Sequence, residues 1–185
     1  MPKLKSFYDS EEEFTEIHHS LKQTSCPHCK RVGCLILHGY LKGYGEDFYD
    51  QDQIRGHRIY CSNRNTRDGC GRTFSLLPSS LLKGFTITAL HLWLFLKKAL
   101  VHASRIAAFK AADIPLCSDA AYYIFRSFSR NASRIRSFLL RRCPVPEPPM
   151  TDDPCRQTIE HLQAAFHDKS CPVSAFQNIF QTAFI

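Results

Sequence analysis

Four of the nine cysteines in this 185-residue chain form two pairs of the kind that bind metal ions. Cys26 and Cys29 lie in the sequence Cys-Pro-His-Cys, so two residues separate their thiols. Cys61 and Cys70 form a second pair with a longer spacer of eight residues, 62–69, where about two to four are usual. Zinc favours four soft thiolates in a tetrahedron, and a turn with two cysteines supplies half of that set. These cysteines therefore predict a Zn²⁺ site with one irregular half.

Other side chains are available if Cys70 lies too far from the first pair. Cys34 is a nearby thiol, and His28, His38 or His57 can also substitute for one ligand. In each case the ion is expected to be structural, because four protein ligands leave no open position for a water nucleophile. The odd number of cysteines and the lack of an apolar signal at the N-terminus favour a reducing cytoplasm over a disulfide framework. No apolar run approaches the roughly 20 residues of a membrane span, so we expect no membrane partner.

The residues around the cysteines have β-like patterns. We predict strands over 34–40, 54–60 and 72–77, with a Gly- and Asp-rich turn over 43–52. The order is that of a zinc ribbon: a cysteine turn, two strands, a second cysteine turn and a third strand. Such a ribbon is too small to bury a stable core alone, so the metal would provide much of its folding free energy.

Positive charge is concentrated after the ribbon. The chain has a net charge of +7, while residues 81–143 carry eleven basic and two acidic side chains, a net charge of +9. This segment has helical periodicity. The first predicted helix begins at a cap at Thr86 or Thr88 and ends at about residue 101. Three more are predicted over 103–112, 119–130 and 132–142. The helices 103–112 and 119–130, joined by a short turn, have the dimensions of a helix-turn-helix.

The charge distribution predicts a polyanionic partner and a set of nucleic-acid contacts. In the helix 119–130, one face is apolar and the opposite face carries tyrosine and arginine side chains, of which Arg126 can read a guanine edge. The residues expected to contact DNA bases or phosphates are Arg126, Arg130, Tyr122, Tyr123, Arg134, Arg136 and Arg105, together with Arg64 and Arg67 from the spacer of the second cysteine pair.

The fold class expected from these patterns is α+β, a small β zinc ribbon followed by a mostly helical domain with a helix-turn-helix. The predicted organisation is an acidic helix in 1–25 capped by Ser10, the ribbon 26–80, the basic helical domain 81–143, a Pro-rich linker 144–150 and C-terminal helices in 151–185. Six apolar positions near the end are expected to be core, or else a docking surface for a protein partner or a second copy: Leu162, Phe166, Phe176, Ile179, Phe180 and Phe184.

Catalytic motifs are lacking in the sequence. It has no Gly-rich phosphate loop, no activated Ser-His pair and no His-Glu metal motif, and the remaining cysteines are scattered. We therefore expect a protein that is not an enzyme.

The segment 26–130 resembles the N-terminal zinc ribbon and helix-turn-helix of transposases from bacterial insertion sequences. The resemblance lies in Cys26-Pro-His-Cys29, Leu37-His-Gly-Tyr40, and Cys70-Gly-Arg-Thr-Phe74 followed by Leu77-Pro78. It implies recognition of element ends by the ribbon and helices, with catalysis in a separate acidic-triad domain. The chain departs from that pattern in its long spacer and in having no length for a nuclease domain after residue 143.

The sequence thus predicts a cytoplasmic, non-catalytic DNA-binding protein, an accessory or regulator related to mobile elements. The alternative is a protein-interaction adaptor whose zinc ribbon and apolar C-terminal helices dock onto a larger complex.

Overall fold

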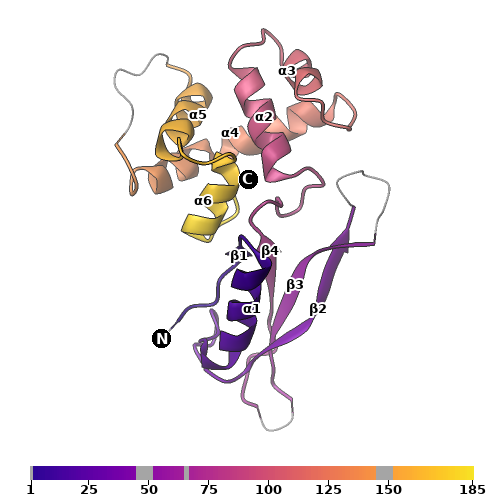
Figure 1. Cartoon of the computed structure of the whole chain (residues 1–185), viewed down its shortest axis with the longest axis vertical. Helices are drawn as coiled ribbons and strands as arrows, with labels where there is room; N and C mark the ends of the chain where they lie inside the picture. Colours follow the sequence, from indigo (N-terminus) through magenta and orange to yellow (C-terminus); the bar gives the residue numbers. More distant parts are fainter. Residues whose placement is uncertain (1, 45–51, 65–66, 145–151) are drawn as a thin grey trace. The chain divides into compact units, whose positions relative to one another are not determined.

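The computed structural model describes residues 2–44, 52–64, 67–144 and 152–185, and it has an α+β fold with a four-stranded sheet and six α-helices (Figure 1). The chain divides into two compact units, Met1–Leu81 and Leu82–Ile185. The first unit contains β1 (Phe7–Tyr8), α1 (Glu11–Ser20), a 3-10 turn (Leu21–Gln23), β2 (Leu35–Gly43), β3 (Gln53–Cys61) and β4 (Thr73–Pro78). The second contains α2 (Ala89–Ala99), α3 (Arg105–Ala111), α4 (Ala120–Leu139), α5 (Pro154–Ala165) and α6 (Pro172–Phe180).

The sheet of the first unit has the strand order β1-β4-β3-β2. β2, β3 and β4 form an antiparallel meander whose strands agree with the three predicted from the sequence. β1 was not predicted: it is two residues long and pairs in parallel with the end of β4, Phe7 opposite Leu77. Two residues are too few for an alternating pattern, so this strand exists because β4 offers it an edge.

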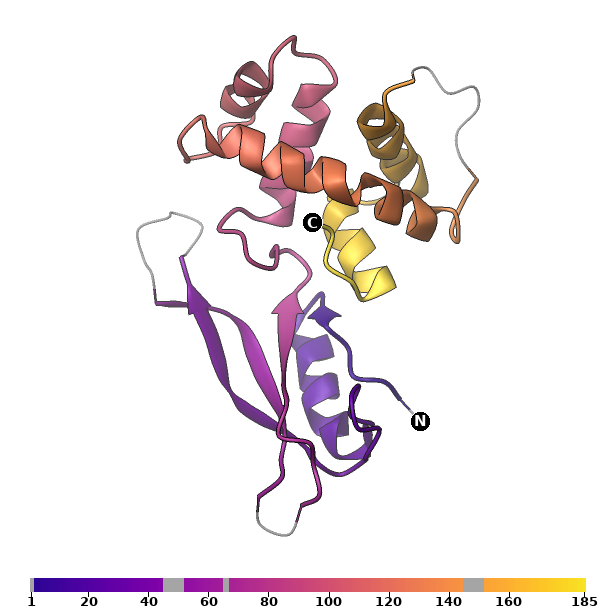
Figure 2. The ribbon, with the colours of Figure 1, turned by 180° about the vertical axis from the view of Figure 1, so that it is seen from behind.

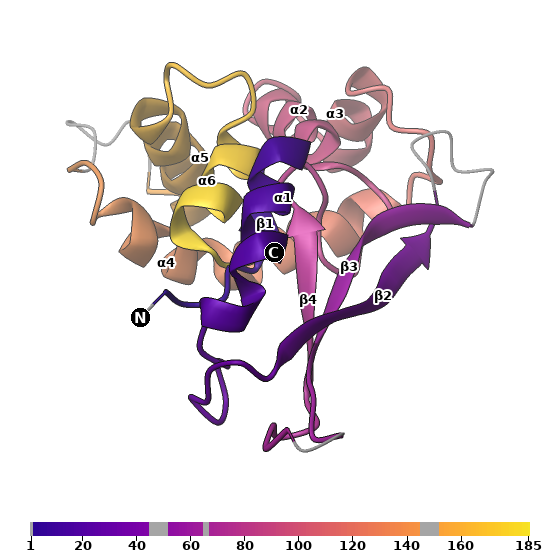
Figure 3. The ribbon, with the colours of Figure 1, turned by 60° about the horizontal axis from the view of Figure 1, so that its bottom comes forward.

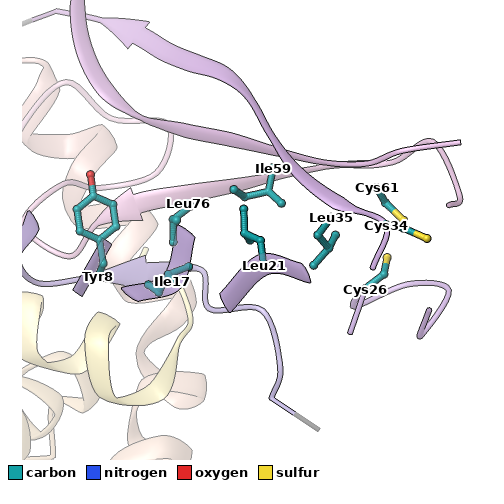
Figure 4. Packing of buried hydrophobic residues seen from close by; sticks show 9 residues of the cluster. All are labelled: Tyr8, Ile17, Leu21, Cys26, Cys34, Leu35, Ile59, Cys61 and Leu76. Carbon is teal, nitrogen blue, oxygen red and sulfur yellow. The ribbon is translucent and has the colours of Figure 1, made fainter. Parts of the chain in front are cut away.

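The core of the first unit lies between one face of this sheet and α1. Along β3 and β4, alternate side chains such as Ile59 and Leu76 are buried on that face. α1 runs along this face of the sheet (Figure 3). Ile17 of α1 and Leu21 of the 3-10 turn pack against the buried strand residues (Figure 4). Cys26, Cys34 and Cys61 extend the same cluster at one end. The cysteine turns are thus part of the core and not appendages to it.

The predicted N-terminal cap of α1 is confirmed. The Ser10 hydroxyl accepts a hydrogen bond from the Glu13 amide at 3.3 Å, which satisfies one of the free amides at the helix start. The Glu13 carboxylate accepts in turn from the backbone amide of Asp9 at 2.7 Å. The first 25 residues therefore contain the expected acidic helix, and also β1 before it and the 3-10 turn after it.

In the second unit, α4 is one continuous helix of 20 residues where we predicted two, 119–130 and 132–142. The prediction of a break was wrong because Asn131 is accommodated within the helix, where its side-chain amide donates to the Ser127 carbonyl at 2.9 Å. The buried side chains continue past this point at helical spacing, and no glycine or proline interrupts them: Ala121, Ile124, Phe128, Ala132, Ile135 and Leu139. Among the helices of the described residues, none is long and apolar enough to cross a membrane.

The C-terminal helices belong to the same unit as α4 (Figure 2). α5 packs against α4 and α6 packs against α2, and Phe176 and Phe184 are fully buried. Arg134 of α4 binds the last residues of the chain. Its guanidinium donates to the carbonyl oxygens of Ala183 at 2.7 Å and Phe184 at 3.0 Å, and to the Thr182 hydroxyl at 3.0 Å. The predicted linker 144–150 lies outside the described residues except for Pro144.

Arg134→Lys is expected to destabilise the second unit by about 1–3 kcal/mol, because an ammonium cannot reproduce several hydrogen bonds from a planar guanidinium. Trp93 is the only tryptophan in the chain and is buried in this unit, so its fluorescence during urea unfolding reports the change. Arg130→Lys is the matched control, because Arg130 is exposed one turn earlier on α4 and should change stability by less than about 0.5 kcal/mol. Equal stabilities of the two variants would contradict this role of Arg134.

Candidate metal centre

The four cysteines predicted as ligands converge at one end of the sheet. Their sulfur atoms all lie within 4.8 Å of one another. Cys26 Sγ is 3.8 Å from Cys70 Sγ, and Cys29 Sγ is 3.7 Å from Cys61 Sγ. These distances are far longer than a disulfide bond of about 2.05 Å, so the four residues are free thiols. The group can hold one metal ion between two cysteine turns.

The first turn is fixed by backbone hydrogen bonds on both sides of the thiols. The Lys30 amide donates to the Cys26 carbonyl at 3.0 Å, and the Cys26 amide donates to the Arg31 carbonyl at 2.9 Å. Lys30 has a positive φ of 64°, which turns the chain back immediately after Cys29. This turn presents both thiols to the same side.

The second turn repeats this pattern residue for residue. The Gly71 amide donates to the Cys61 carbonyl at 2.9 Å, and the Cys61 amide donates to the Arg72 carbonyl at 2.9 Å. Gly71 takes the position of Lys30, directly after the second cysteine, and has a similar φ of 70°. The two halves of the site are therefore equivalent in local structure, in spite of their different spacing in the sequence.

The backbone around Ser62 and Gly69 explains how a spacer of eight residues fits this turn. The Gly69 amide donates to the Ser62 carbonyl at 2.9 Å, which closes the base of the intervening segment. The chain thus leaves the turn after Ser62 and returns at Gly69. Ser62 and Gly69, joined by this hydrogen bond, therefore take the place of the two spacer residues between Cys61 and Cys70. A Cβ on Gly69 would lie 2.2 Å from the Ser62 oxygen, so glycine is required for this close approach.

Backbone amides and burial shift the pKa values of the cysteine thiols in opposite directions. A hydrogen bond from the backbone of Arg31 is the largest effect on Cys29 and lowers the pKa of its thiol to about 7. Burial raises the pKa of the Cys61 thiol, although the Cys70 amide donates to its sulfur at 3.3 Å. The His28 amide donates to Cys26 Sγ at 3.4 Å. These amides point at the sulfurs and stabilise negative charge there, as a metal-bound thiolate requires.

The alternative ligands considered from the sequence lie outside this group. Cys34 is buried, and its thiol is directed at the Val32 carbonyl at 3.7 Å. The His38 ring lies against Tyr60, and the His57 ring stacks on Phe14 with 3.9 Å between centroids. Among the described residues, the four predicted cysteines are the group that can hold an ion.

The residues predicted to contact nucleic acid separate into two sets. Tyr122, Tyr123, Arg126 and Arg130 are exposed along α4, as their positions on the polar face implied. Arg134, Arg136 and Arg105 have contacts within the second unit. Arg136 donates to the Pro154 carbonyl at 2.7 Å and to the Thr158 hydroxyl at 3.1 Å, and the Arg105 guanidinium lies 4.3 Å from the centre of the Phe125 ring. The partners of Arg134 and Arg136 are 18 to 50 residues away in the sequence and include backbone carbonyls, so sequence reasoning could not identify these structural roles.

Arg64 and Arg67 lie in the spacer that leaves the second cysteine turn, and both are exposed. The Arg64 guanidinium lies over the Tyr60 ring, 5.9 Å from its centre. Residues 65 and 66 between them are outside the described residues.

Cys61→Ser and Cys70→Ser are each expected to abolish stoichiometric metal binding, because a hydroxyl is a poor replacement for a thiolate ligand. Metal content measured on purified protein by plasma mass spectrometry tests this, with circular dichroism as a check on folding. Cys34→Ser is the control, a buried neighbouring thiol outside the group, and should keep its metal. Loss of metal from the control but not from the other two variants would refute the ligand set.

Gly69→Ala is expected to destabilise the second turn by about 1–3 kcal/mol, because the added methyl group overlaps the Ser62 carbonyl. The change should appear as faster transfer of the metal to a chromogenic chelator. A Cβ on Gly43 would lie 2.8 Å from Arg55 Cδ, which belongs to a flexible side chain that can move aside. Gly43→Ala is therefore the matched control. Equal rates for both variants would show that the closure at Ser62 and Gly69 does not support the metal site.

Comparison with known proteins gave no significant match to a protein-family model, to a curated protein or to a solved structure. Function must therefore be argued from the site and the surfaces of this chain.

Proposed function

We propose that this chain is a non-catalytic DNA-binding protein whose first unit is a zinc ribbon. The observation that carries the proposal is the exposed side of α4, which combines arginine, tyrosine and serine side chains and no acidic residue.

The α4 surface has the size and chemistry of a nucleic-acid contact. At 100° per residue, the exposed side chains of α4 fall within about one third of the helix circumference. They are Tyr122, Tyr123, Arg126, Ser129, Arg130, Ser133 and Ser137. A helix of 20 residues is about 30 Å long, and the major groove of DNA is wide enough to admit it. Hydroxyl and guanidinium groups donate to phosphates, and arginine also pairs with the edge of guanine.

The neighbouring helix supports this geometry. α3 precedes α4, and the connection Ala112–Asp119 turns with a positive φ of 52° at Asp113. Arg105 at the start of α3 packs on Phe125 of α4, which couples the two helices. We propose that α3 and α4 act as a helix-turn-helix with a longer turn than the three to four residues that are usual.

Zinc is the ion that the sulfur geometry favours. Two sulfurs at 2.3 Å from a tetrahedral zinc ion lie about 3.8 Å apart, which agrees with the 3.8 and 3.7 Å separations in this structure. Four thiolates complete the coordination, so the proposed role of the ion is to stabilise the fold of the first unit.

Fewer observations support the alternative function as a protein-interaction adaptor. It combines docking by the zinc ribbon with docking by apolar side chains near the C-terminus. Of these side chains, Leu162, Phe166, Phe176 and Phe184 are fully buried within the second unit. Phe180 is half-buried and Ile179 is 47% exposed, which is a small apolar area for a docking surface.

Arg126→Glu is expected to weaken binding to duplex DNA by about tenfold or more, because it removes a cation from the centre of the α4 surface and adds repulsion. Fluorescence anisotropy with a labelled random duplex, at several salt concentrations, measures this, and wild-type affinity should fall steeply as salt rises. Lys169→Glu changes the net charge equally at an exposed site and should have little effect. Absence of wild-type binding at low salt, or equal losses in both variants, would refute the proposal.

A further inference from the structure

The face of the sheet opposite to α1 differs from the core face and is not used by the proposed function. Along β3, His57 and Ile59 are buried against α1, so Arg58 and Tyr60 project to the other side. Arg58 is exposed and Tyr60 is half-buried. The three strands of the meander contain no acidic residue. Of their cations, Arg58 lies on this face, while Lys42 forms an ion pair with Asp52 at 3.2 Å.

The neighbours of Tyr60 hold its ring in place. The Tyr60 hydroxyl donates to Asn63 Oδ1 at 2.5 Å, and the His38 ring meets the Tyr60 ring edge-on with 5.0 Å between centroids. Arg64 lies over the ring at 5.9 Å. An aromatic ring that is fixed at its hydroxyl and its edge loses little conformational entropy when a flat ligand stacks on it.

The cross-strand neighbours of Arg58 are small. They are Gly39 and Ser75, whereas those of Tyr60 are Ile36 and Thr73. Gly39 and Ser75 leave the Arg58 side chain accessible, and Arg58 is exposed. This arrangement offers an aromatic surface next to guanidinium groups at fixed positions.

We propose that this face binds a single-stranded nucleic acid, with an unpaired base stacked on Tyr60 and the adjacent phosphates bound by Arg58 and Arg64. Stacking on aromatic side chains together with a positively charged surface is how proteins bind unpaired strands without reading their sequence. A duplex cannot stack a base on Tyr60, because its bases are paired and stacked internally. The site belongs to the first unit, whereas α4 belongs to the second, and it does not depend on the proposed duplex binding.

The test uses the full-length, metal-loaded chain and two labelled probes, 15-nucleotide oligothymidylate and oligouridylate, at low salt. Tyr60→Leu is expected to weaken binding by about fivefold or more, the effect of losing one stacked base. Tyr60→Phe keeps the ring and should stay close to wild type. The two probes distinguish DNA from RNA as the natural ligand, and binding of either that depends on the Tyr60 ring supports the proposal.

A second measurement does not depend on whether the variants fold. Irradiation of wild-type protein with an oligonucleotide containing 5-iodouracil should produce a crosslink at Tyr60, located by mass spectrometry. Arg126→Glu should lower duplex binding and leave this crosslink intact, so failure of either proposal is visible without the other. Wild-type protein that binds neither probe, equal affinities of Tyr60→Leu and Tyr60→Phe, or crosslinks only on α4 would overturn the inference.

Discussion

The first unit depends on the convergence of four thiols at the ends of three strands. β2 begins shortly after the first cysteine turn, β3 ends at Cys61, and β4 begins shortly after Cys70. An ion held between the turns would therefore fix where all three strands start or end. The apolar cluster beside it is small, and its buried part already includes Cys26, Cys34 and Cys61. Because so few apolar side chains are buried, the folding of this unit is expected to be coupled to metal binding.

Within the first unit, α1 covers one face of the sheet. Ile59 and Leu76 are buried on that side, whereas Arg58 on the opposite side is exposed and Tyr60 is half-buried. The opposite side carries Arg58 and Tyr60, and the three long strands contain no acidic residue, a charge balance that favours a polyanion. The cysteine turns, which fix the ends of these strands, thus position this surface as well as the core.

Much of the first unit was predictable from local patterns. The cysteine pairs and the alternation along 54–60 and 72–77 indicated the ligands and the strands, because each signal lies within a few residues. The fit of the long spacer was not predictable, since it depends on a contact through space between Gly69 and Ser62. β1 was missed because it exists only through its partner β4. In the second unit we placed a break near Asn131, whose hydrogen bond to Ser127 shows that a polar residue within a helix is not a stop signal.

The arginines of α4 show why net charge alone does not locate a binding surface. Arg126 and Arg130 lie on its exposed side, whereas Arg134 and Arg136, one to two turns later, bind the C-terminal residues and α5. All four contribute equally to the charge of the segment and hence to its long-range attraction for a polyanion. Only a guanidinium without internal acceptors can exchange water for phosphate at no cost to the fold. Arg134 and Arg136 are therefore expected to stabilise the fold of the second unit, while contact with nucleic acid is expected from Arg126 and Arg130.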